Sequence, residues 1–414
     1  MTNAAVKLSP PGYEALTPQT AVQYAARIKK IADAIGGDPT RWTCDEVGDG
    51  NLNLVFIIRG ASGAVVLKQA LPYVRLVGES WPLPLYRAHY EHLALAEQYQ
   101  HTPKIVPQTF HYDETMALTV MEYLTPHVIL RKELIAGKRF PNLAAHLGHF
   151  LAQTLFFTSD LALTAEEKRN KMTPYLGNIA MCKITEDLIF DEPYFAAPMN
   201  KNTAGIDDLA KAFQQDTPLK LAAQEMKWRF LNAPEALCHG DLHTGSIMVT
   251  DTDMRVIDPE FAFYGPIGFD IGMLLANFVM AYFAQDAHED RADYKEWILS
   301  TALATFETFI SEFTQLWQSR AGEAYQSRVI TAADSAAALD ARMQQISSDV
   351  LGFCGVEIIR RILGLAHVAD FESIADETKR AKCERKALLF ARELLVNKAA
   401  YPTPKEFTAL IKNQ

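Results

Sequence analysis

Residues 238–249 read CHGDLHTGSIMV and residues 255–262 read RVIDPEFA, and these two stretches decide the fold. Each contains a short apolar segment, and the polar turn at 250–253 between them predicts a β-hairpin. Asp241 stands just before this hairpin and Asp258 just after it. Because pairing brings the outer ends of the two strands together, we expect the two carboxylates to lie near one another. Neighbouring carboxylates can hold Mg²⁺, which prefers oxygen ligands and usually keeps substrate phosphates in its shell.

The first third of the sequence is rich in strand signals. Apolar runs at 52–59 and 64–69 flank the turn sequence GASG, which predicts a second hairpin. The spacing of apolar residues predicts helices at 20–35 and 85–99, and a short apolar run predicts a strand at 117–121.

The rest of the sequence is dominated by helical patterns, and Pro126, which breaks regular structure, marks the change. The predicted helices cover residues 143–158, 268–283, 297–317, 332–347, 350–369 and 386–398. The fold class is therefore predicted to be α+β. A small β-rich N-terminal lobe is expected over 1–124, and a larger, mostly α-helical C-terminal lobe over 125–414.

The composition argues for a folded protein without a nucleic-acid partner. Hydrophobic residues make up 49% of the chain and charged residues 22%, which is typical of globular proteins and not of disordered ones. Forty basic residues against fifty acidic ones give a net charge of −10, and no basic stripe is visible. Proteins that bind nucleic acids usually carry a basic excess or a basic stripe.

The cysteines and the apolar runs bear on the location of the protein. The five cysteines are scattered without a Cys-x-x-Cys pair, so we expect reduced thiols and neither disulfides nor a zinc site. The N-terminal residues lack the apolar core of a signal peptide, and the longest apolar run, 271–284, is shorter than the ~20 residues of a membrane span. We expect a cytoplasmic protein that does not bind membranes.

The order of parts around residue 241 resembles that of the protein kinases, in which a His-x-Asp loop precedes a hairpin and a metal-binding Asp. The variant HGDLH is similar to the aminoglycoside and choline kinase branch of that fold. Longer strings resemble the S-methyl-5-thioribose kinase family. These strings are GDGNLNLVF at 48–56, VGESWPL at 77–83, HGDLHTGSI at 239–247, DPEFAFYGPIGFD at 258–270 and IIRR at 358–361.

The resemblance implies a protein-kinase-like bilobal fold and an ATP-dependent enzyme that requires Mg²⁺. Members of the family phosphorylate the anomeric hydroxyl of methylthioribose, a step of methionine salvage, and are usually homodimers. The partners implied are thus ATP, a small sugar and a second copy of the chain.

The resemblance also implies roles for residues of the two stretches quoted first. Asp241 matches the catalytic aspartate, which would bind the substrate hydroxyl, orient it and accept its proton. Asp258 and Glu260 match the metal-binding pair, and with Pro259 they would contact the nucleotide. Protein kinases place a metal-binding Asn five residues after the catalytic Asp, where this chain has Ser246, so either Ser246 or Glu260 completes the metal shell.

The resemblance places further nucleotide contacts before residue 126. Lys68, on the second strand of the predicted hairpin, would contact the α- and β-phosphates, and Asn53 is favoured over Asn51 as a nucleotide contact. The hinge residues Glu122, Tyr123 and Leu124 would read the adenine edge through their backbone groups.

Two assignments in this part of the chain stay open. Glu91 is the candidate ion-pair partner of Lys68, although Glu97 lies on the same predicted helix. The Trp81 segment reads either as a loop over the cleft or as an anchor of the hairpin.

Arg360 and Arg361 are the candidate substrate-binding cations. They are consecutive on a predicted helix and therefore ~100° apart around its axis, so that one would face the cleft and the other would brace it. Two guanidinium groups would repel a cationic aminoglycoside or choline, whereas a neutral sugar would not be repelled.

Three other functions remain as alternatives. The chain could be a kinase for another alcohol, such as an aminoglycoside or choline, or a nucleotide-binding module without activity. A metal-dependent hydrolase using His239 and His243 is the third, because their His-x-Asp-x-His spacing occurs in hydrolases.

Overall fold

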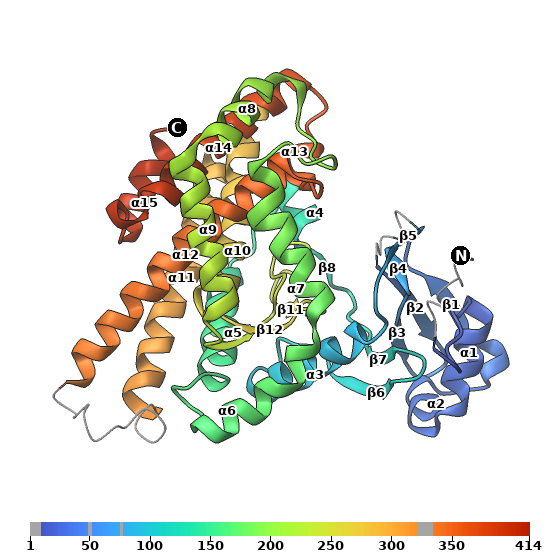
Figure 1. The fold of residues 1–414 in the computed structure, drawn as a ribbon. Coiled ribbons are helices and arrows are strands. Elements are labelled where there is room, and N and C mark those ends of the chain that lie inside the picture. Colours follow the sequence, from blue (N-terminus) through green and yellow to red (C-terminus); the bar gives the residue numbers. More distant parts are fainter. Residues whose placement is uncertain (1–9, 49–51, 75–77, 321–333) are drawn as a thin grey trace, which may run out of the picture. The chain divides into compact units, whose positions relative to one another are not determined.

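A computed structural model gives the fold of the chain (Figure 1). It describes all residues except 1–9, 49–51, 75–77 and 321–333. The predicted glycine-containing loop and the start of the Trp81 motif therefore lie partly outside the described residues.

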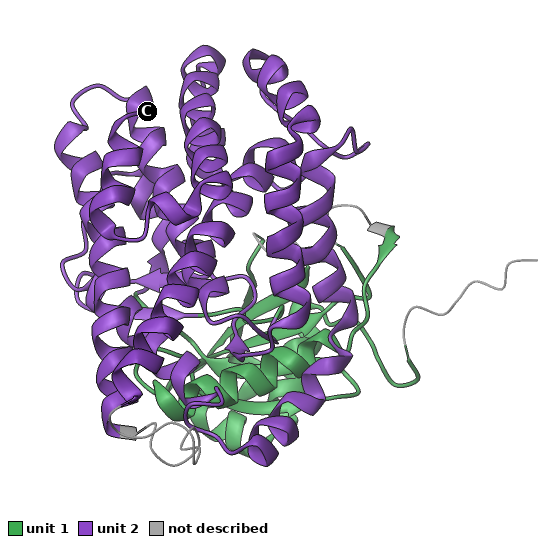
Figure 2. Ribbon diagram, turned by 60° about the vertical axis from the view of Figure 1, so that its left-hand side comes forward, with its two compact units in different colours: residues 1–126, 257–261 green, residues 127–256, 262–414 purple. Residues whose placement is uncertain are grey.

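The chain divides into two compact units, which Figure 2 colours separately. The first unit comprises residues 1–126 and 257–261, and the second comprises residues 127–256 and 262–414. A short segment from the middle of the sequence thus belongs with the N-terminal part. The predicted domain boundary after residue 124 stays a prediction.

An antiparallel sheet of five strands, in the order β1-β2-β3-β7-β6, is the base of the first unit. The strands are β1 (Thr43–Glu46), β2 (Asn53–Arg59), β3 (Ala64–Ala70), β6 (Thr109–Asp113) and β7 (Leu118–Glu122). The predicted hairpin is formed by β2 and β3, and the predicted strand at 117–121 is β7.

The two faces of this sheet carry different kinds of side chain. One face packs its alternating apolar side chains, such as Phe56 and Leu67, against α1 (Pro18–Arg27) and α2 (Lys29–Ile35) (Figure 1). Side chains alternate between faces along a strand, so Lys68, next to Leu67, points to the other face. The expected helix at 20–35 is interrupted at Ile28, whose extended backbone separates α1 from α2.

Two smaller elements complete the first unit. Helix α3 (Arg87–His101) corresponds to the helix expected at 85–99. Strands β4 (Tyr73–Val74) and β5 (Gly78–Pro82) pair with each other, so Trp81 lies in a strand and the expectation of a loop there was wrong.

The second unit contains two small sheets. Strands β8 (Val128–Ile129), β10 (Ile247–Val249) and β11 (Met254–Val256) form one sheet, and β9 (Ala236–Cys238) pairs with β12 (Phe263–Gly265) in the other. The hairpin predicted from the opening stretch is confirmed as β10 and β11.

Helices make up most of the second unit, as predicted. They are α4 (Leu130–Ile135), α5 (Leu143–Phe157), α6 (Ala165–Met172), α7 (Ile179–Thr185), α8 (Asp207–Gln215), α9 (Thr217–Asn232), α10 (Gly268–Ala284), α11 (Ala292–Arg320), α12 (Ser335–Leu363), α13 (Ala369–Glu372), α14 (Glu377–Val396) and α15 (Pro404–Lys412). Every residue of α10 is buried, which explains its apolar sequence. In the described part of the chain, no helix combines the length and apolar character that a bilayer crossing requires.

Some helix boundaries differ from the prediction. The helices expected at 332–347 and 350–369 are one helix, α12, which ends at Leu363. The short helices α6 and α7 were not predicted: α6 contains few apolar residues, and α7, at seven residues, is too short to show a helical period. All five cysteines are free thiols, as expected.

A buried acid in the second unit leads to a prediction about stability. Burial raises the pKa of Glu384, on α14, to about 7, and one of its carboxylate oxygens has no hydrogen-bond partner. Between its ordinary pKa of 4.5 and this raised value, the native state holds a proton that the unfolded chain has lost. The contribution of Glu384 to stability is therefore full at acidic pH and is lost as the pH rises through about 7.

In the variant Glu384→Gln the side chain at position 384 is uncharged at every pH. Its contribution to stability is therefore not lost as the pH rises. The melting temperature of the variant minus that of the wild type should thus increase between about pH 5 and about pH 8. Thermal melts of both proteins at the two pH values measure this difference. A difference that stays constant would contradict the prediction.

Candidate active site

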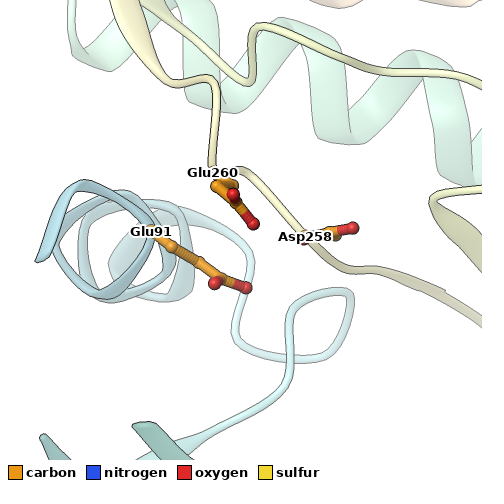
Figure 3. A group of neighbouring side chains, drawn as sticks. All are labelled: Glu91, Asp258 and Glu260. Carbon is orange, nitrogen blue, oxygen red and sulfur yellow. The ribbon is translucent and has the colours of Figure 1, made fainter. Parts of the chain in front are cut away.

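The first unit gathers three carboxylates that lie far apart in the sequence. Glu91 comes from α3, whereas Asp258 and Glu260 come from the segment 257–261 (Figure 3). One oxygen of each lies within 4.8 Å of the others, and we name this group the carboxylate cluster. It contains both residues that were predicted to bind the metal.

Lys68 contacts all three members of the carboxylate cluster. Its Nζ lies 2.7 Å from Glu91 Oε1 and 3.9 Å from Glu260 Oε2, and it donates a hydrogen bond to Asp258 Oδ1. The structure therefore pairs Lys68 with Glu91, the partner favoured from the sequence.

The charges of this group depend on one another. Burial opposes the charge on Lys68, but the nearby carboxylates, Asp258 foremost, raise the pKa of its ammonium above the ordinary value. Burial raises the pKa of Glu91 to about 7, although Lys68 acts in the opposite direction. The ammonium thus stays charged and is held by an excess of negative charge.

Glu260 is fixed by two further side chains. Its Oε1 accepts a hydrogen bond of 2.6 Å from Arg87 Nε, and its Oε2 accepts one of 2.6 Å from Asn53 Nδ2. Arg87 also donates to Asn53 Oδ1 at 3.1 Å and to the backbone carbonyls of Leu52 and Leu71, each at 2.7 Å. These bonds connect strand β2, helix α3 and the segment 257–261.

Arg87 is a residue that the sequence reasoning missed. It is buried almost completely, with 1% of its surface exposed, which is rare for an arginine. A single basic residue at the start of a helix has no distinctive pattern, so only the structure identifies its role.

Asp258 has an unusual backbone. Its φ angle is +71°, in the left-handed region that residues other than glycine rarely adopt. Its side chain is 51% exposed and carries one of the contacts to Lys68. Asp is one of the few residues other than glycine that are enriched in this conformation, so the backbone angle is compatible with a carboxylate at this position.

The predicted hinge residues lie at the end of β7. The ring of Tyr123 packs against Arg59, whose guanidinium carbon lies 5.1 Å from the ring centre, and its hydroxyl accepts a hydrogen bond of 3.1 Å from Arg59. Glu122 Oε2 accepts a hydrogen bond from the backbone of Gln108, and Leu124 is buried. These contacts fix the side chains.

The second unit holds Asp241 on the loop between β9 and β10. Gly240, with φ of +86°, makes the turn that leads to Asp241. Asp270 on α10 anchors this turn, because its carboxylate accepts hydrogen bonds from the backbone N–H groups of His239 (2.6 Å) and Gly240 (3.0 Å). Sequence reasoning assigned Asp270 no role, although it ends one of the strings that resemble the kinase family.

His243 and Ser246 close the same loop. His243 Nδ1 accepts hydrogen bonds of 3.0 Å from the backbone N–H groups of Gly245 and Ser246. Ser246 Oγ lies 3.1 Å from the carbonyl oxygen of Asp241 and accepts a hydrogen bond from the His243 backbone N–H. Both side chains are thus used to shape the loop.

The hydrogen bonds of His243 determine which nitrogen carries its proton. Since Nδ1 accepts, the proton is on Nε2, which lies 3.5 Å from Asp241 Oδ2. Burial, followed by the charges of nearby arginines, lowers the pKa of His243 well below its ordinary value. His243 is therefore a neutral group that directs an N–H toward Asp241.

This protonation state argues against the hydrolase alternative, because neither nitrogen of His243 offers a lone pair to a metal. Among the described residues, two groups bring at least three His, Cys, Asp or Glu ligand atoms within 4.8 Å of one another, namely the carboxylate cluster and Glu186, Asp187 and Asp191. Neither contains His239 or His243. The second group is neutralised in part by Lys183 and Lys227.

Arg360 and Arg361 both face Asp241. The Nη2 atom of each lies 3.7 Å from Asp241 Oδ1, so the two are not divided into one residue that faces the cleft and one that braces it. Asp241 is 28% exposed, whereas both arginines are buried. The loop thus presents a reachable carboxylate next to two buried cations.

Apart from the hinge residues 122–124 at the end of β7, the predicted site residues fall into two groups. The first unit brings together Asn53, Lys68, Asp258 and Glu260, with the buried Pro259 between the last two. The second unit brings together Asp241, Arg360 and Arg361. The expected proximity of Asp241 and Asp258 stays a prediction.

Comparison with known proteins adds independent findings. Residues 43–304 match the phosphotransferase enzyme family. The methylthioribose kinase of Escherichia coli (strain S88) is 46% identical over 94% of this chain and 95% of its own length. Methylthioribose kinase 1 of rice (Oryza sativa subsp. japonica) is 44% identical over 93% and 92%, respectively. The solved choline/ethanolamine kinase family protein of Mesorhizobium loti aligns with 96% of this chain and 99% of its own, at 14% identity and a TM-score of 0.45.

The tautomer of His243 can be tested directly. We expect its ring to remain the neutral Nε2–H form from about pH 8 down to about pH 5, because burial and nearby arginines disfavour the charged form. Long-range ¹H–¹⁵N spectra of the histidine rings report the tautomer, and the variant His243→Asn identifies the signal by its loss. Protonation with a pKa near 6.5 would contradict the assignment.

Proposed function

Because the chain belongs to the phosphotransferase enzyme family and, within it, to the methylthioribose kinases, we propose that it phosphorylates S-methyl-5-thioribose. ATP donates the phosphoryl group and the anomeric hydroxyl accepts it. The products are the sugar 1-phosphate and ADP, and the reaction belongs to methionine salvage.

The observation that carries this proposal is the environment of Asp241. A partly exposed carboxylate flanked by two buried guanidinium groups suits a neutral alcohol that becomes an anionic phosphate ester. A cationic aminoglycoside or choline would meet two positive charges next to the reacting group. The geometry thus supports a neutral sugar over the cationic substrates of the alternative kinases.

In the proposed reaction, the anomeric oxygen of the sugar attacks the γ-phosphorus of ATP. The bond between that phosphorus and the oxygen that bridges to the β-phosphate breaks, and its electron pair leaves with ADP. Asp241 accepts the proton of the hydroxyl and orients the oxygen for attack. An anomeric hydroxyl is more acidic than an ordinary alcohol, so a carboxylate is an adequate base.

The carboxylate cluster has the donor atoms that Mg²⁺ requires. It offers oxygen ligands alone, within 4.8 Å of one another. Asp258 and Glu260 would hold the ion, which when bound neutralises charge on the β- and γ-phosphates. The hydroxyl of Ser246 is bonded within its own loop, whereas each oxygen of Glu260 accepts one hydrogen bond and keeps a further lone pair, which supports Glu260 over Ser246 as the second protein ligand.

The remaining nucleotide contacts are proposed in the first unit. Lys68 would bind the α- and β-phosphates, and Asn53 and Pro259 would contact the nucleotide near them. Lys68 and Asn53 come from neighbouring strands and both bond to the carboxylate cluster, which supports a shared task. The segment Glu122, Tyr123 and Leu124 would read the adenine edge.

Two further properties of the family are part of the proposal. The protein would act in the cytoplasm and would form a homodimer. Sedimentation velocity of the purified protein tests the second property.

The substrate is tested by measuring ADP release with methylthioribose, an aminoglycoside and choline. We expect turnover with methylthioribose alone, because the Nη2 groups of Arg360 and Arg361 point to Asp241 and would lie next to a cationic group of an amine substrate. The variant Asp241→Asn should lower that turnover by on the order of 10²–10⁴-fold, since it removes the base. Turnover of an amine without turnover of methylthioribose would overturn the proposed substrate.

The metal ligands are tested with Asp258→Asn. The variant should need more Mg²⁺ for half-maximal rate and should lose turnover, because an amide is a weaker ligand than a carboxylate. The variant should still fold, since Asn tolerates a positive φ, the side chain is half exposed and Lys68 keeps its ion pair with Glu91.

A matched control for Asp258→Asn is Asp187→Asn. It changes a member of the other acidic group and should leave the Mg²⁺ dependence as in the wild type. An unchanged Mg²⁺ dependence in Asp258→Asn would remove this residue from the metal site.

A further inference from the structure

Glu357 is a fully buried glutamate whose two oxygens each hold one arginine. Its Oε2 accepts a hydrogen bond of 2.6 Å from Arg360 Nε, and its Oε1 accepts one of 2.7 Å from Arg361 Nε. No surface of its side chain is exposed (0%). Because residues three and four positions apart share a face of a helix, one carboxylate on α12 can reach both consecutive arginines.

The contacts of Glu357 determine which edge of each guanidinium is presented to Asp241. Glu357 binds the Nε atom of both arginines, and the Nη2 atom of each is then turned toward Asp241 Oδ1. The shared anchor thus holds two side chains that start ~100° apart on the helix in an arrangement that converges on one point.

The distances to the two arginines indicate different functions for Glu357 and Asp241. The bonds to Glu357 are short charge-assisted hydrogen bonds, whereas both arginines lie 3.7 Å from Asp241, beyond hydrogen-bond length. Glu357 is therefore the firm partner of the pair. Asp241 is left with a looser ion pair and keeps its oxygens available to a substrate hydroxyl.

The balance of charge supports the same difference in function between Glu357 and Asp241. Arg360 and Arg361 carry two positive charges in a buried place, and Glu357 offsets one of them. If Glu357 were absent, both cations would depend on Asp241, and Arg361 in addition on the more distant charge of Asp370, which pairs with Arg131. The proton acceptor would then be drawn into a tighter pair with the arginines.

We propose that Glu357 is a positioning residue of the phosphoryl-transfer site. It fixes Arg360 and Arg361 so that their Nη groups face the sugar and the transferred phosphoryl group, and it keeps Asp241 free to accept the proton. This inference rests on the proposed function, because it assigns the arginines to the reacting substrate.

The variant Glu357→Gln tests the proposal. Its amide places an N–H group against one Nε, so at least one arginine loses its anchor. We expect kcat/KM for the sugar to fall by about 10²-fold, as for a small misplacement of reacting groups. KM for ATP should change by less than about threefold, since the proposed nucleotide residues belong to the first unit.

A matched control lies on the same helix. Asp349 is also buried and pairs with Arg229 at 2.6 Å, but it has no contact to Asp241 in the second unit. Asp349→Asn should lower the melting temperature as much as Glu357→Gln does, yet leave kcat/KM for the sugar within about threefold of the wild type. Equal losses of kcat/KM in the two variants would mean that Glu357 is only structural, and would overturn the proposal.

A double variant separates positioning from general damage. If Glu357 acts through the arginines, Glu357→Gln should cost much less kcat/KM in a background of Arg361→Lys than in the wild type. Additive losses would overturn the proposal.

Should Glu357→Gln fail to fold, Glu357→Asp keeps the charge but is too short to reach both Nε atoms. It should fold and still lose kcat/KM for the sugar, and full activity would overturn the proposal. The kcat/KM assays use whichever of the three substrates, methylthioribose, the aminoglycoside or choline, the wild type phosphorylates. Failure of the proposed function, seen as no turnover of methylthioribose by the wild type, is thereby distinct from failure of the role of Glu357.

Discussion

The first unit depends on pairing one buried ammonium with three carboxylates. Lys68 lies on β3, Glu91 on α3, and Asp258 and Glu260 on a segment almost two hundred residues away in sequence. Removing an ion from water costs several kcal/mol unless it is paired and hydrogen-bonded, so each of these groups requires the others. Arg87 and Asn53 extend the pairing to β2. The network therefore determines where the sheet, the helix and the segment meet.

In the second unit the arrangement of charge is reversed, because one accessible anion lies next to two buried cations. Glu357 binds the cations, His243 contributes a neutral N–H, and Asp270 holds the backbone of the loop. Asp241 is left partly exposed, with no short hydrogen bond to either arginine. In both units, the site residues that the sequence motifs predicted are held in position by residues to which the sequence analysis assigned no role.

The sequence predicted those elements whose signals are local. A turn between two apolar runs was enough to predict β2–β3 and β10–β11, and the spacing and length of an apolar run interrupted only by Asn277 were enough for α10. Helix α12 was divided in the prediction because Ser347 and Ser348 interrupt its apolar spacing, although tertiary packing keeps it continuous. The roles of Arg87, Asp270 and Glu357 could not be predicted from local patterns, because each depends on partners that only folding provides. Arg360 and Arg361 were found through resemblance, but their common orientation follows from Glu357.

The path of the chain limits how this protein can be divided or recombined. The chain leaves the first unit after residue 126, returns for residues 257–261 and leaves again. A gene fragment that ends at residue 126 would therefore encode Lys68 and Arg87 without Asp258 and Glu260, and would leave two interior cations short of counter-ions. Exchange of the N-terminal part between related sequences has to carry this five-residue return segment along, so the smallest transferable unit is discontinuous.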